Sequence, residues 1–191
     1  MPLAISPHFT NEHFREPLSI GDKISLFSDR VRGWQLDIAQ YLESHPHAGF
    51  GILSIISSYF EMIAKYEDGQ TSITASKKYF KQGVRLVLEP NTDPAELPIP
   101  ETVLDLLYNE VRCGMYHAGI TGPSVQLNKD LPAPLGFREG TLTVNTDLLV
   151  LTLQDHFSRY LTRLLDPANQ RLRDNFEKRF DAGHRGKRLG Q

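Results

Sequence analysis

The sequence predicts one mainly α-helical domain, and three observations support that prediction. Apolar side chains recur every three or four positions over several long segments, which is the spacing of a helix with one buried face. The chain has 191 residues, close to the usual size of one hydrophobic core. Its composition, 40% hydrophobic and 23% charged, is that of an ordinary globular protein.

The chain divides into three parts by pattern. Residues 1–17 lack periodicity and are expected to form an irregular arm, whereas residues 18–166 carry the periodic segments of the helical domain. Residues 167–191 are expected to form a polar helix and a basic tail, with seven Lys or Arg side chains against three acidic ones. Such a tail can contact nucleic acid phosphates, but a solvated chain end is the commoner role.

The first helix is expected over residues 20–42 and ends before Pro46, which cannot continue it. Its expected buried stripe comprises Ile24, Phe27, Val31, Trp34, Ile38 and Leu42. The second helix, around residues 52–63, is apolar on nearly its whole circumference, which favours a central position. Glu61 is the one charged residue in that stretch.

A third, more polar helix is expected over residues 72–89, followed by a Pro-rich connector at 90–100. A fourth is expected from Pro100 to about Gly119, since Pro suits the first turn of a helix. The inward side chains of these two helices are expected to be Tyr79, Phe80, Val84, Leu88, Val103, Leu104, Leu107, Val111 and Met115.

The pattern changes after the fourth helix. Val125 and Leu127 alternate with polar neighbours, and residues 141–144 do so after a Glu139-Gly140 turn, so we expect a small β-hairpin here. A fifth helix follows, capped by Asn145 or Thr146, and a polar sixth helix covers about 169–180. The fifth helix is expected to bury Leu148, Leu151, Phe157, Tyr160, Leu161 and Leu164. The predicted fold is a helical bundle with a small β-hairpin insertion before the last core helix.

Composition also narrows the function classes. Cys113 is the single cysteine, so no disulfide within the chain and no multi-cysteine zinc site can form, which fits a reducing compartment. The N-terminal residues lack the pattern of a secretory signal, and no apolar run approaches the roughly 20 residues that span a bilayer. We therefore expect a cytoplasmic protein without a membrane partner.

Unusual residues concentrate in the fourth helix, at positions 108–117. Arg112 and His117 are five positions apart, about 140° around an ideal helix and about 7.5 Å along it, which is poor spacing for an ion pair on one helix. A group outside the helix is therefore expected to use them. Gly114 lies between them at a cost of roughly 1 kcal/mol relative to Ala, which indicates close approach of another backbone or a ligand, such as a partner helix.

The string Glu-Val-Arg-Cys-Gly-Met-Tyr-His-Ala-Gly at residues 110–119 resembles the HEPN superfamily, and a bacterial HEPN-like branch in particular. The resemblance covers the helices from about Ala48 to Asp166. It implies a homodimer whose motif helices face a shared cleft and cut RNA without a metal ion or other cofactor. It also implies a toxin or defence effector, with an antitoxin or regulatory partner.

In this family-based hypothesis His117 acts as general acid or base around attack of the ribose 2′-hydroxyl, and Arg112 stabilises charge on the phosphate. Glu61 is a third candidate catalytic residue, because a carboxylate in an apolar helix is costly to bury unless it is paired, and Arg112 is a plausible partner. Tyr116 is a candidate for stacking on a base, although an aromatic residue at this place is more often packing.

Two alternatives stay open. Many catalytic family members have Asn or Asp after the motif Arg, whereas this chain has Cys113, which favours a non-catalytic module that binds RNA, a nucleotide or a protein. The other alternative is a structural dimerisation domain with a buried Arg112–Glu61 ion pair and His117 at the helix end. His45 and His47 flank Pro46 and lack further ligands at metal-site spacing, so no metal site is expected.

Overall fold

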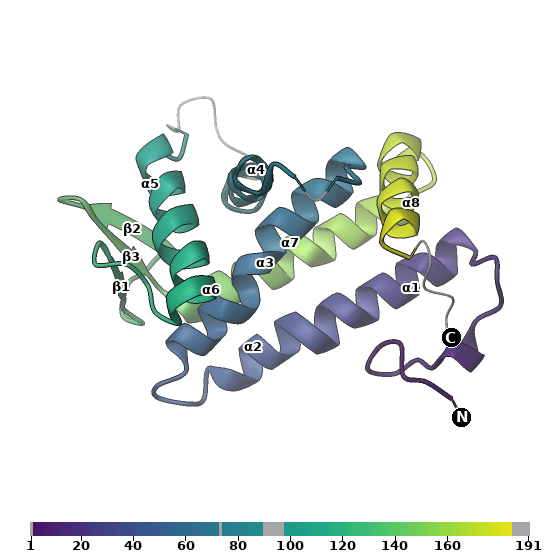
Figure 1. The fold of residues 1–191 in the computed structure, drawn as a ribbon, viewed down its shortest axis with the longest axis horizontal. Helices are drawn as coiled ribbons and strands as arrows, with labels where there is room; N and C mark the ends of the chain where they lie inside the picture. The colour runs from purple at the N-terminus through teal and green to yellow at the C-terminus, as the bar shows by residue number, and fades with distance from the viewer. Residues whose placement is uncertain (1, 73, 90–97, 185–191) are drawn as a thin grey trace.

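A computed structural model describes residues 2–72, 74–89 and 98–184 of the chain. Most of the expected connector at 90–100 and the last residues of the basic tail lie outside the described residues. Within the described ranges the protein is mainly helical and has one small β-sheet (Figure 1), as the sequence predicts.

Eight α-helices form the described body. They are α1 (Ile20–Val31), α2 (Asp37–Leu42), α3 (Gly49–Asp68), α4 (Ser76–Leu88), α5 (Glu101–Leu106), α6 (Gly114–Ala118), α7 (Thr146–Leu165) and α8 (Gln170–His184). Two π-helical segments, Arg32–Leu36 and Leu107–Cys113, join α1 to α2 and α5 to α6 as continuous helices. The expected third helix begins at Ser76 rather than residue 72.

Helix α3 occupies the centre of the bundle, as its apolar sequence predicts. It packs against α2, α4, α7 and α8 (Figure 1). Helix α4 approaches α3 closely, because a Cβ atom on Gly83 would lie 1.8 Å from the backbone oxygen of Phe60. Gly69 ends α3 in the left-handed conformation, with φ of 63°, which glycine adopts at little cost.

The π-helical segment in the first helix overturns part of the predicted buried stripe. Trp34 and Ile38 were expected in the core but are 55% and 45% exposed, whereas Leu36 and Ala39 are buried. A π segment adds one residue to a turn and rotates the following side chains around the helix axis. The inward face therefore passes from Val31 to Leu36 rather than to Trp34.

Helix α7 begins as predicted but buries a different stripe near its start. The Asn145 side chain accepts hydrogen bonds from the backbone N–H groups of Asp147 and Leu148, which confirms the expected cap. Leu151 is 48% exposed, contrary to prediction, and Val150 and Leu153 are buried instead. The first turns of α7 are apolar on both sides, so their sequence does not fix which side faces inward.

The sheet confirms the predicted hairpin turn but corrects the pairing. Strands β1 (Val125–Leu127), β2 (Leu135–Arg138) and β3 (Thr141–Val144) lie in the order β1-β3-β2. The turn at Glu139-Gly140 joins β2 to β3 as an antiparallel pair, whereas β1 runs parallel to β3. The loop between β1 and β2 is fixed by the Asn145 side-chain amide, which donates hydrogen bonds to the backbone oxygens of Lys129 and Leu131.

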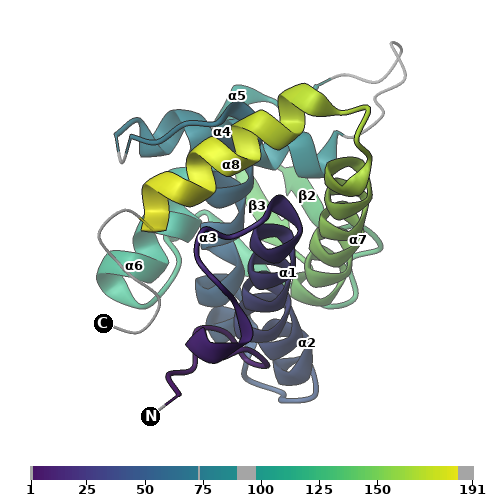
Figure 2. The same cartoon turned by 90° about the vertical axis from the view of Figure 1, so that its right-hand side faces the viewer.

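Helix α8 belongs to the same hydrophobic core as the preceding helices. Its side chains Leu172, Phe176 and Phe180 are buried, and it contacts α1, α3 and α7. Figure 2 shows α8 in the foreground, crossing α1 and α3.

The N-terminal arm is fixed by His8, whose ring nitrogen and backbone N–H both form hydrogen bonds with the Asp29 carboxylate. Among the described helices, none is both long and apolar enough to cross a membrane.

Candidate functional site

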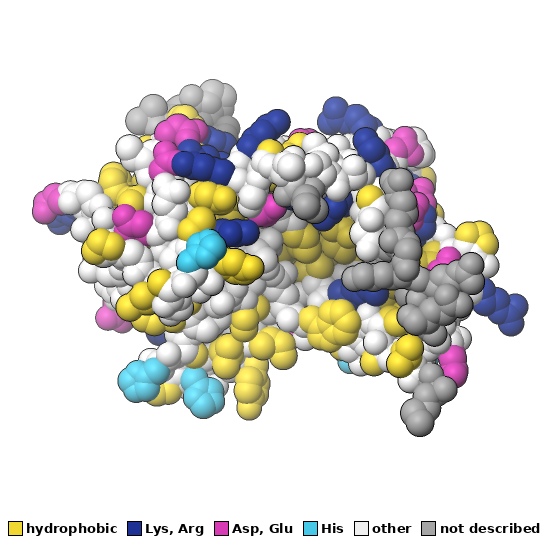
Figure 3. Space-filling view, viewed as in Figure 1, with side chains coloured by type: hydrophobic (Ala, Val, Ile, Leu, Met, Phe, Trp, Pro, Cys, Tyr) yellow, Lys and Arg dark blue, Asp and Glu magenta, His cyan; other side chains and the backbone are white. Residues whose placement is uncertain are grey.

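A cavity of about 320 Å³ opens between α3, α6 and α8. Figure 3 shows the hollow on this face, with hydrophobic side chains at its floor. Three serine side chains of α3, Ser54, Ser57 and Ser58, contribute hydroxyl groups to its wall. Its charged lining residues are Glu61, Lys65, Arg112 and Arg179. The cavity therefore has two more positive than negative charges among the residues that line it.

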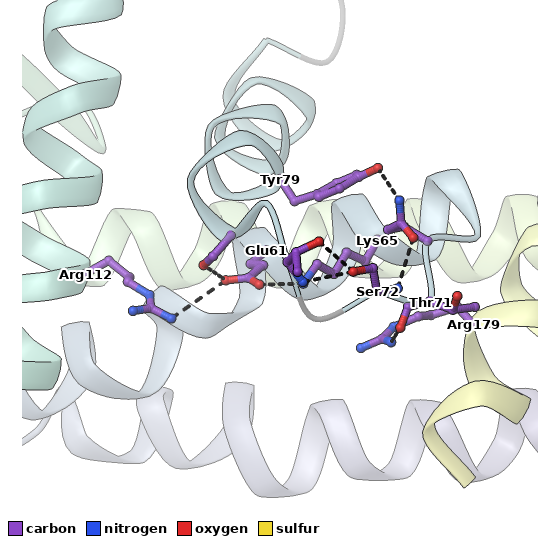
Figure 4. Close-up of polar contacts among 10 residues, drawn as sticks. Glu61, Lys65, Thr71, Ser72, Tyr79, Arg112 and Arg179 are labelled. Carbon is purple, nitrogen blue, oxygen red and sulfur yellow. Dashed lines mark hydrogen bonds and ion pairs between the residues drawn. The ribbon is translucent and has the colours of Figure 1, made fainter. Parts of the chain in front are cut away.

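Glu61 lies at the centre of a polar cluster (Figure 4). Its Oε1 accepts from the Lys65 ammonium at 2.6 Å, and its Oε2 accepts from the Ser76 hydroxyl and lies 3.8 Å from Nη2 of Arg112. Burial raises the pKa of Glu61, but the hydrogen bonds from Lys65 and Ser76 and the charges of Lys65 and Arg112 outweigh it, so this pKa lies below its ordinary 4.5. Glu61 is therefore an ionised anchor at neutral pH and a poor proton acceptor.

Arg112 is held in place and still accessible. Its guanidinium carbon lies 5.9 Å from the ring centre of Tyr108 and 5.4 Å from that of Tyr116, within cation–π range. The Arg112 side chain is 28% exposed. The expected proximity of Arg112 and Glu61 is confirmed. The structural-dimer alternative requires this ion pair to be buried in the core, but the pair lies at the edge of the cavity.

Sequence reasoning missed two cations of the cavity. Lys65 is only 5% exposed, and it lies four positions after Glu61 on α3, a helical spacing that offered a signal for the pair. Arg179 comes from α8, where its guanidinium lies near the backbone oxygen of Thr71 and the ring of Tyr66. The sequence assigns Arg179 to a polar terminal helix, and nothing local indicates that this helix closes the cavity.

Tyr116 and His117 lie side by side at the outer rim. Tyr116 lines the cavity and is 76% exposed. His117 is exposed, is absent from the cavity lining, and packs edge-on against the Tyr116 ring at 4.9 Å between centres. One copy of the chain thus brings together Arg112, Glu61 and Tyr116 but leaves His117 outside. Cys113 is half-buried with a free thiol.

Gly114 is explained by the chain's own loop rather than by a partner helix. A Cβ atom at this position would lie 2.7 Å from the backbone oxygen of Ile120. Glu110 holds the same loop, because its Oε2 accepts from the backbone N–H of Ser124 at 2.8 Å. Its backbone oxygen accepts from the N–H of Gly122 at 3.0 Å. The predicted close approach is confirmed, but it carries no argument for dimerisation.

Arg112 itself lies in the π-helical segment Leu107–Cys113. Such segments are rare and occur frequently at functional sites, because the extra residue re-aims a side chain from an otherwise regular helix.

No family model, curated protein or solved structure matches the chain. Within the described ranges, no three His, Cys, Asp or Glu side chains gather in a way that could hold a metal ion.

Proposed function

We propose that this protein is a HEPN-type endoribonuclease that works as a homodimer in the cytoplasm, with Arg112 at the phosphate and without a metal ion. The observation that carries the proposal is the presentation of Arg112. Glu61 and two aromatic rings restrict the guanidinium, yet it remains open to the cavity. A restrained, accessible guanidinium is suited to a phosphate, since its planar donors match the phosphate oxygens.

The rest of the cavity suits an RNA backbone. Lys65 and Arg179 add positive charge on the side of Glu61 away from Arg112 (Figure 4). The Ser54 hydroxyl can donate to a phosphate or sugar oxygen, whereas the other two serine hydroxyls of this wall already donate to backbone oxygens of α3. The exposed ring of Tyr116 offers a flat face for an unpaired base. These features favour single-stranded RNA over a small metabolite as the ligand of this cavity.

In the proposed reaction the ribose 2′-hydroxyl loses its proton to a general base and attacks the neighbouring phosphorus. The bond from phosphorus to the 5′-oxygen breaks, and a general acid protonates that oxygen, which leaves a cyclic phosphate and a free 5′-hydroxyl. His117 supplies the proton-transferring imidazole, and Arg112 stabilises the charge that develops on the phosphate. Glu61 acts as a positioning residue, because its carboxylate is already occupied by Lys65 and Ser76.

A second copy of the chain would complete this site. His117 faces outward beside Tyr116, so that an RNA strand held between two copies could contact Arg112 of one and His117 of the other. Exposed apolar side chains of the neighbouring helix supply a surface for association, namely Trp34, Ile38 and Tyr41. Their helix adjoins the cavity wall, since its Gln35 side chain donates to the Ser58 hydroxyl of that wall at 2.7 Å. An antitoxin or other regulatory partner could block the enzyme by covering the same face.

A second candidate function is a non-catalytic HEPN-like module that binds RNA, a nucleotide or a protein through the Arg112 cavity. The position of His117 outside the cavity favours it, because binding needs only Arg112 and its cationic neighbours. The Cys113 thiol after Arg112, in place of Asn or Asp, points the same way.

Cleavage of end-labelled RNA in EDTA tests the proposal. Purified wild type is compared with His117→Ala and Arg112→Ala, and with His45→Ala as a control for loss of an exposed histidine in the α2–α3 turn. The nuclease proposal expects cleavage by wild type and the control and its loss in both site variants, with folding and association state unchanged. Absence of cleavage across a broad RNA panel, together with Arg112-dependent RNA binding, would favour the binding module.

A further inference from the structure

A second concave region lies between α4 and α7 and shares no lining residue with the Arg112 cavity. It consists of two adjoining cavities of about 540 Å³ and 440 Å³, which meet at Arg159. The larger, which we call the basic cavity, is lined by three arginines, and the other is mostly apolar. Their combined size and the separation of charged from apolar lining are those of a small-molecule site.

Three arginines line the basic cavity: Arg85 from α4, and Arg159 and Arg163 from α7. Glu89 is the one carboxylate among the lining residues of this cavity. Positive charge therefore exceeds negative charge by two among these side chains. An anion is the ligand that such a lining favours.

One of these arginines has a partner that it can readily exchange. Arg159 pairs with Asp155 one turn earlier on α7, and because this carboxylate is 62% exposed the ion pair contributes little. The other two arginines are held more firmly. Arg85 pairs with Glu101 at 2.8 Å and also with Glu89, whose side chain is 14% exposed, and Arg163 pairs with Glu67, whose side chain is 13% exposed. Arg159 is thus the arginine that is available to an incoming anion.

His156 adds a neutral donor to the same cavity. Its Nδ1 lies 2.9 Å from the Tyr59 hydroxyl, for which the described residues provide no other acceptor. The hydroxyl therefore donates to Nδ1, which leaves the imidazole proton on Nε2. Burial, together with the charges of Arg159 and Arg163, lowers the pKa of His156 to about 4, so the ring is neutral at pH 7.

The Tyr160 hydroxyl is a buried polar group at the wall of the same cavity. The residue is 1% exposed and lines the basic cavity, and its hydroxyl has no hydrogen-bond partner among the described residues. Buried hydroxyl groups almost always have a partner in native proteins, because leaving one unpaired is costly. A ligand oxygen in the cavity would supply that partner.

The adjoining cavity is built from aliphatic and aromatic side chains of α4, α5 and the sheet. Those that face it include Val87, Leu88, Val103, Leu135, Phe137 and Leu142. Its charged lining residues, Asp155 and Arg159, stand where it meets the basic cavity. A molecule that fills both cavities has a hydrocarbon part and one anionic end.

We propose that this groove binds an amphiphilic anion, a molecule with a short hydrocarbon chain and a single phosphate or carboxylate head. The head lies against Arg159 and the Nε2–H of His156, with Arg85 beside it, and accepts from the Tyr160 hydroxyl. The chain lies between α5 and β2, against Phe137. This site is separate from the Arg112 cavity and does not depend on the function proposed for it.

Isothermal titration of the full chain with four probes tests this assignment. Octyl phosphate and octanoate, both below their micelle concentrations, carry the two candidate heads on one chain. Inorganic phosphate carries the head alone, and octanol the chain alone. We expect one or both of the amphiphiles to bind with 1:1 stoichiometry, at least tenfold more tightly than inorganic phosphate or octanol. The preferred amphiphile identifies the head.

Three variants locate the binding. Arg159→Gln and Phe137→Ser alter the two halves of the groove at partly exposed side chains, and Lys178→Gln removes a charge from the exposed face of α8. Loss of a charge-assisted hydrogen bond predicts about tenfold weaker binding in Arg159→Gln, with Phe137→Ser weakened as well and Lys178→Gln unchanged. Equal affinity in Arg159→Gln and Lys178→Gln, or no binding of either amphiphile, would overturn the proposal.

Discussion

The ammonium of Lys65 lies 2.6 Å from Oε1 of Glu61, one turn away on the central helix α3. With its side chain only 5% exposed, Lys65 depends on this carboxylate for its charge partner. The pair fixes the Glu61 carboxylate so that its other oxygen faces Ser76 and Arg112. A structural ion pair inside the bundle thus orients the arginine that we assign to phosphate binding.

Glu61→Gln is expected to destabilise the protein by about 1–3 kcal/mol, because it leaves the Lys65 ammonium buried without a full counter-charge. Urea unfolding at pH 7 measures the change. Glu139→Gln is the matched control, since Glu139 is 82% exposed and should change stability by less than about 0.5 kcal/mol. Equal stability of the two variants would show that the pair does not hold α3 as described.

His156 is expected to make stability depend on pH between about 6.5 and 4. Burial lowers its folded pKa to about 4 from 6.5, so the unfolded chain binds the proton first as pH falls. The contribution of His156 to the free energy of unfolding is complete above pH 6.5 and is lost as pH falls to about 4. The loss of stability is about 3 kcal/mol. Chemical unfolding of wild type and His156→Gln across this range measures it. Parallel pH profiles for the two proteins would contradict it.

Two glycine substitutions are expected to act in opposite directions. Gly114→Ala places a Cβ atom 2.7 Å from the Ile120 backbone oxygen, so it should destabilise by about 1–3 kcal/mol and displace the loop after α6. Gly183→Ala meets nothing within 4 Å on α8 and should stabilise by up to about 1 kcal/mol. Thermal unfolding compares them. A stabilised Gly114→Ala variant would show that the loop does not approach the helix this closely.

Association through the apolar face beside the cavity predicts a monomer for Trp34→Glu. Trp34 is 55% exposed, and a charge there would have to be desolvated in the dimer interface. Sedimentation velocity over a concentration series measures the dissociation constant, which we expect to rise at least tenfold. Leu165→Glu, at a 61% exposed position at the far end of α7, is the control. A dimer that survives Trp34→Glu would place the interface elsewhere.

Helical periodicity predicts the helices, the central position of α3 and the Asn145 cap, because burial and capping are local properties of sequence. It fails at Trp34 and Ile38, since a π-helical segment shifts the inward face by one residue. It also misses strand β2, whose four residues include Gly136 and are ordered by pairing with β3.

For the site, the sequence predicts that Glu61 and Arg112 meet, because a carboxylate in an apolar helix requires a partner. It does not predict the contribution of Arg179, which depends on how α8 folds back across α3. The outward position of His117 is likewise a tertiary property. It depends on the rotation of the helix at the π-helical segment and on the loop packed against Gly114.

One measurement tests most directly whether this cavity binds a phosphate backbone. It is the affinity of an Arg112→Gln variant for single-stranded RNA. Fluorescence anisotropy would be measured in EDTA on a His117→Ala background, so that the RNA stays intact. We expect Arg112→Gln to weaken binding about tenfold or more and to reduce the salt slope by about one, while Arg138→Gln, at a surface cation that is 89% exposed, changes neither. Equal affinities for Arg112→Gln and Arg138→Gln would contradict the assignment of RNA to the Arg112 cavity.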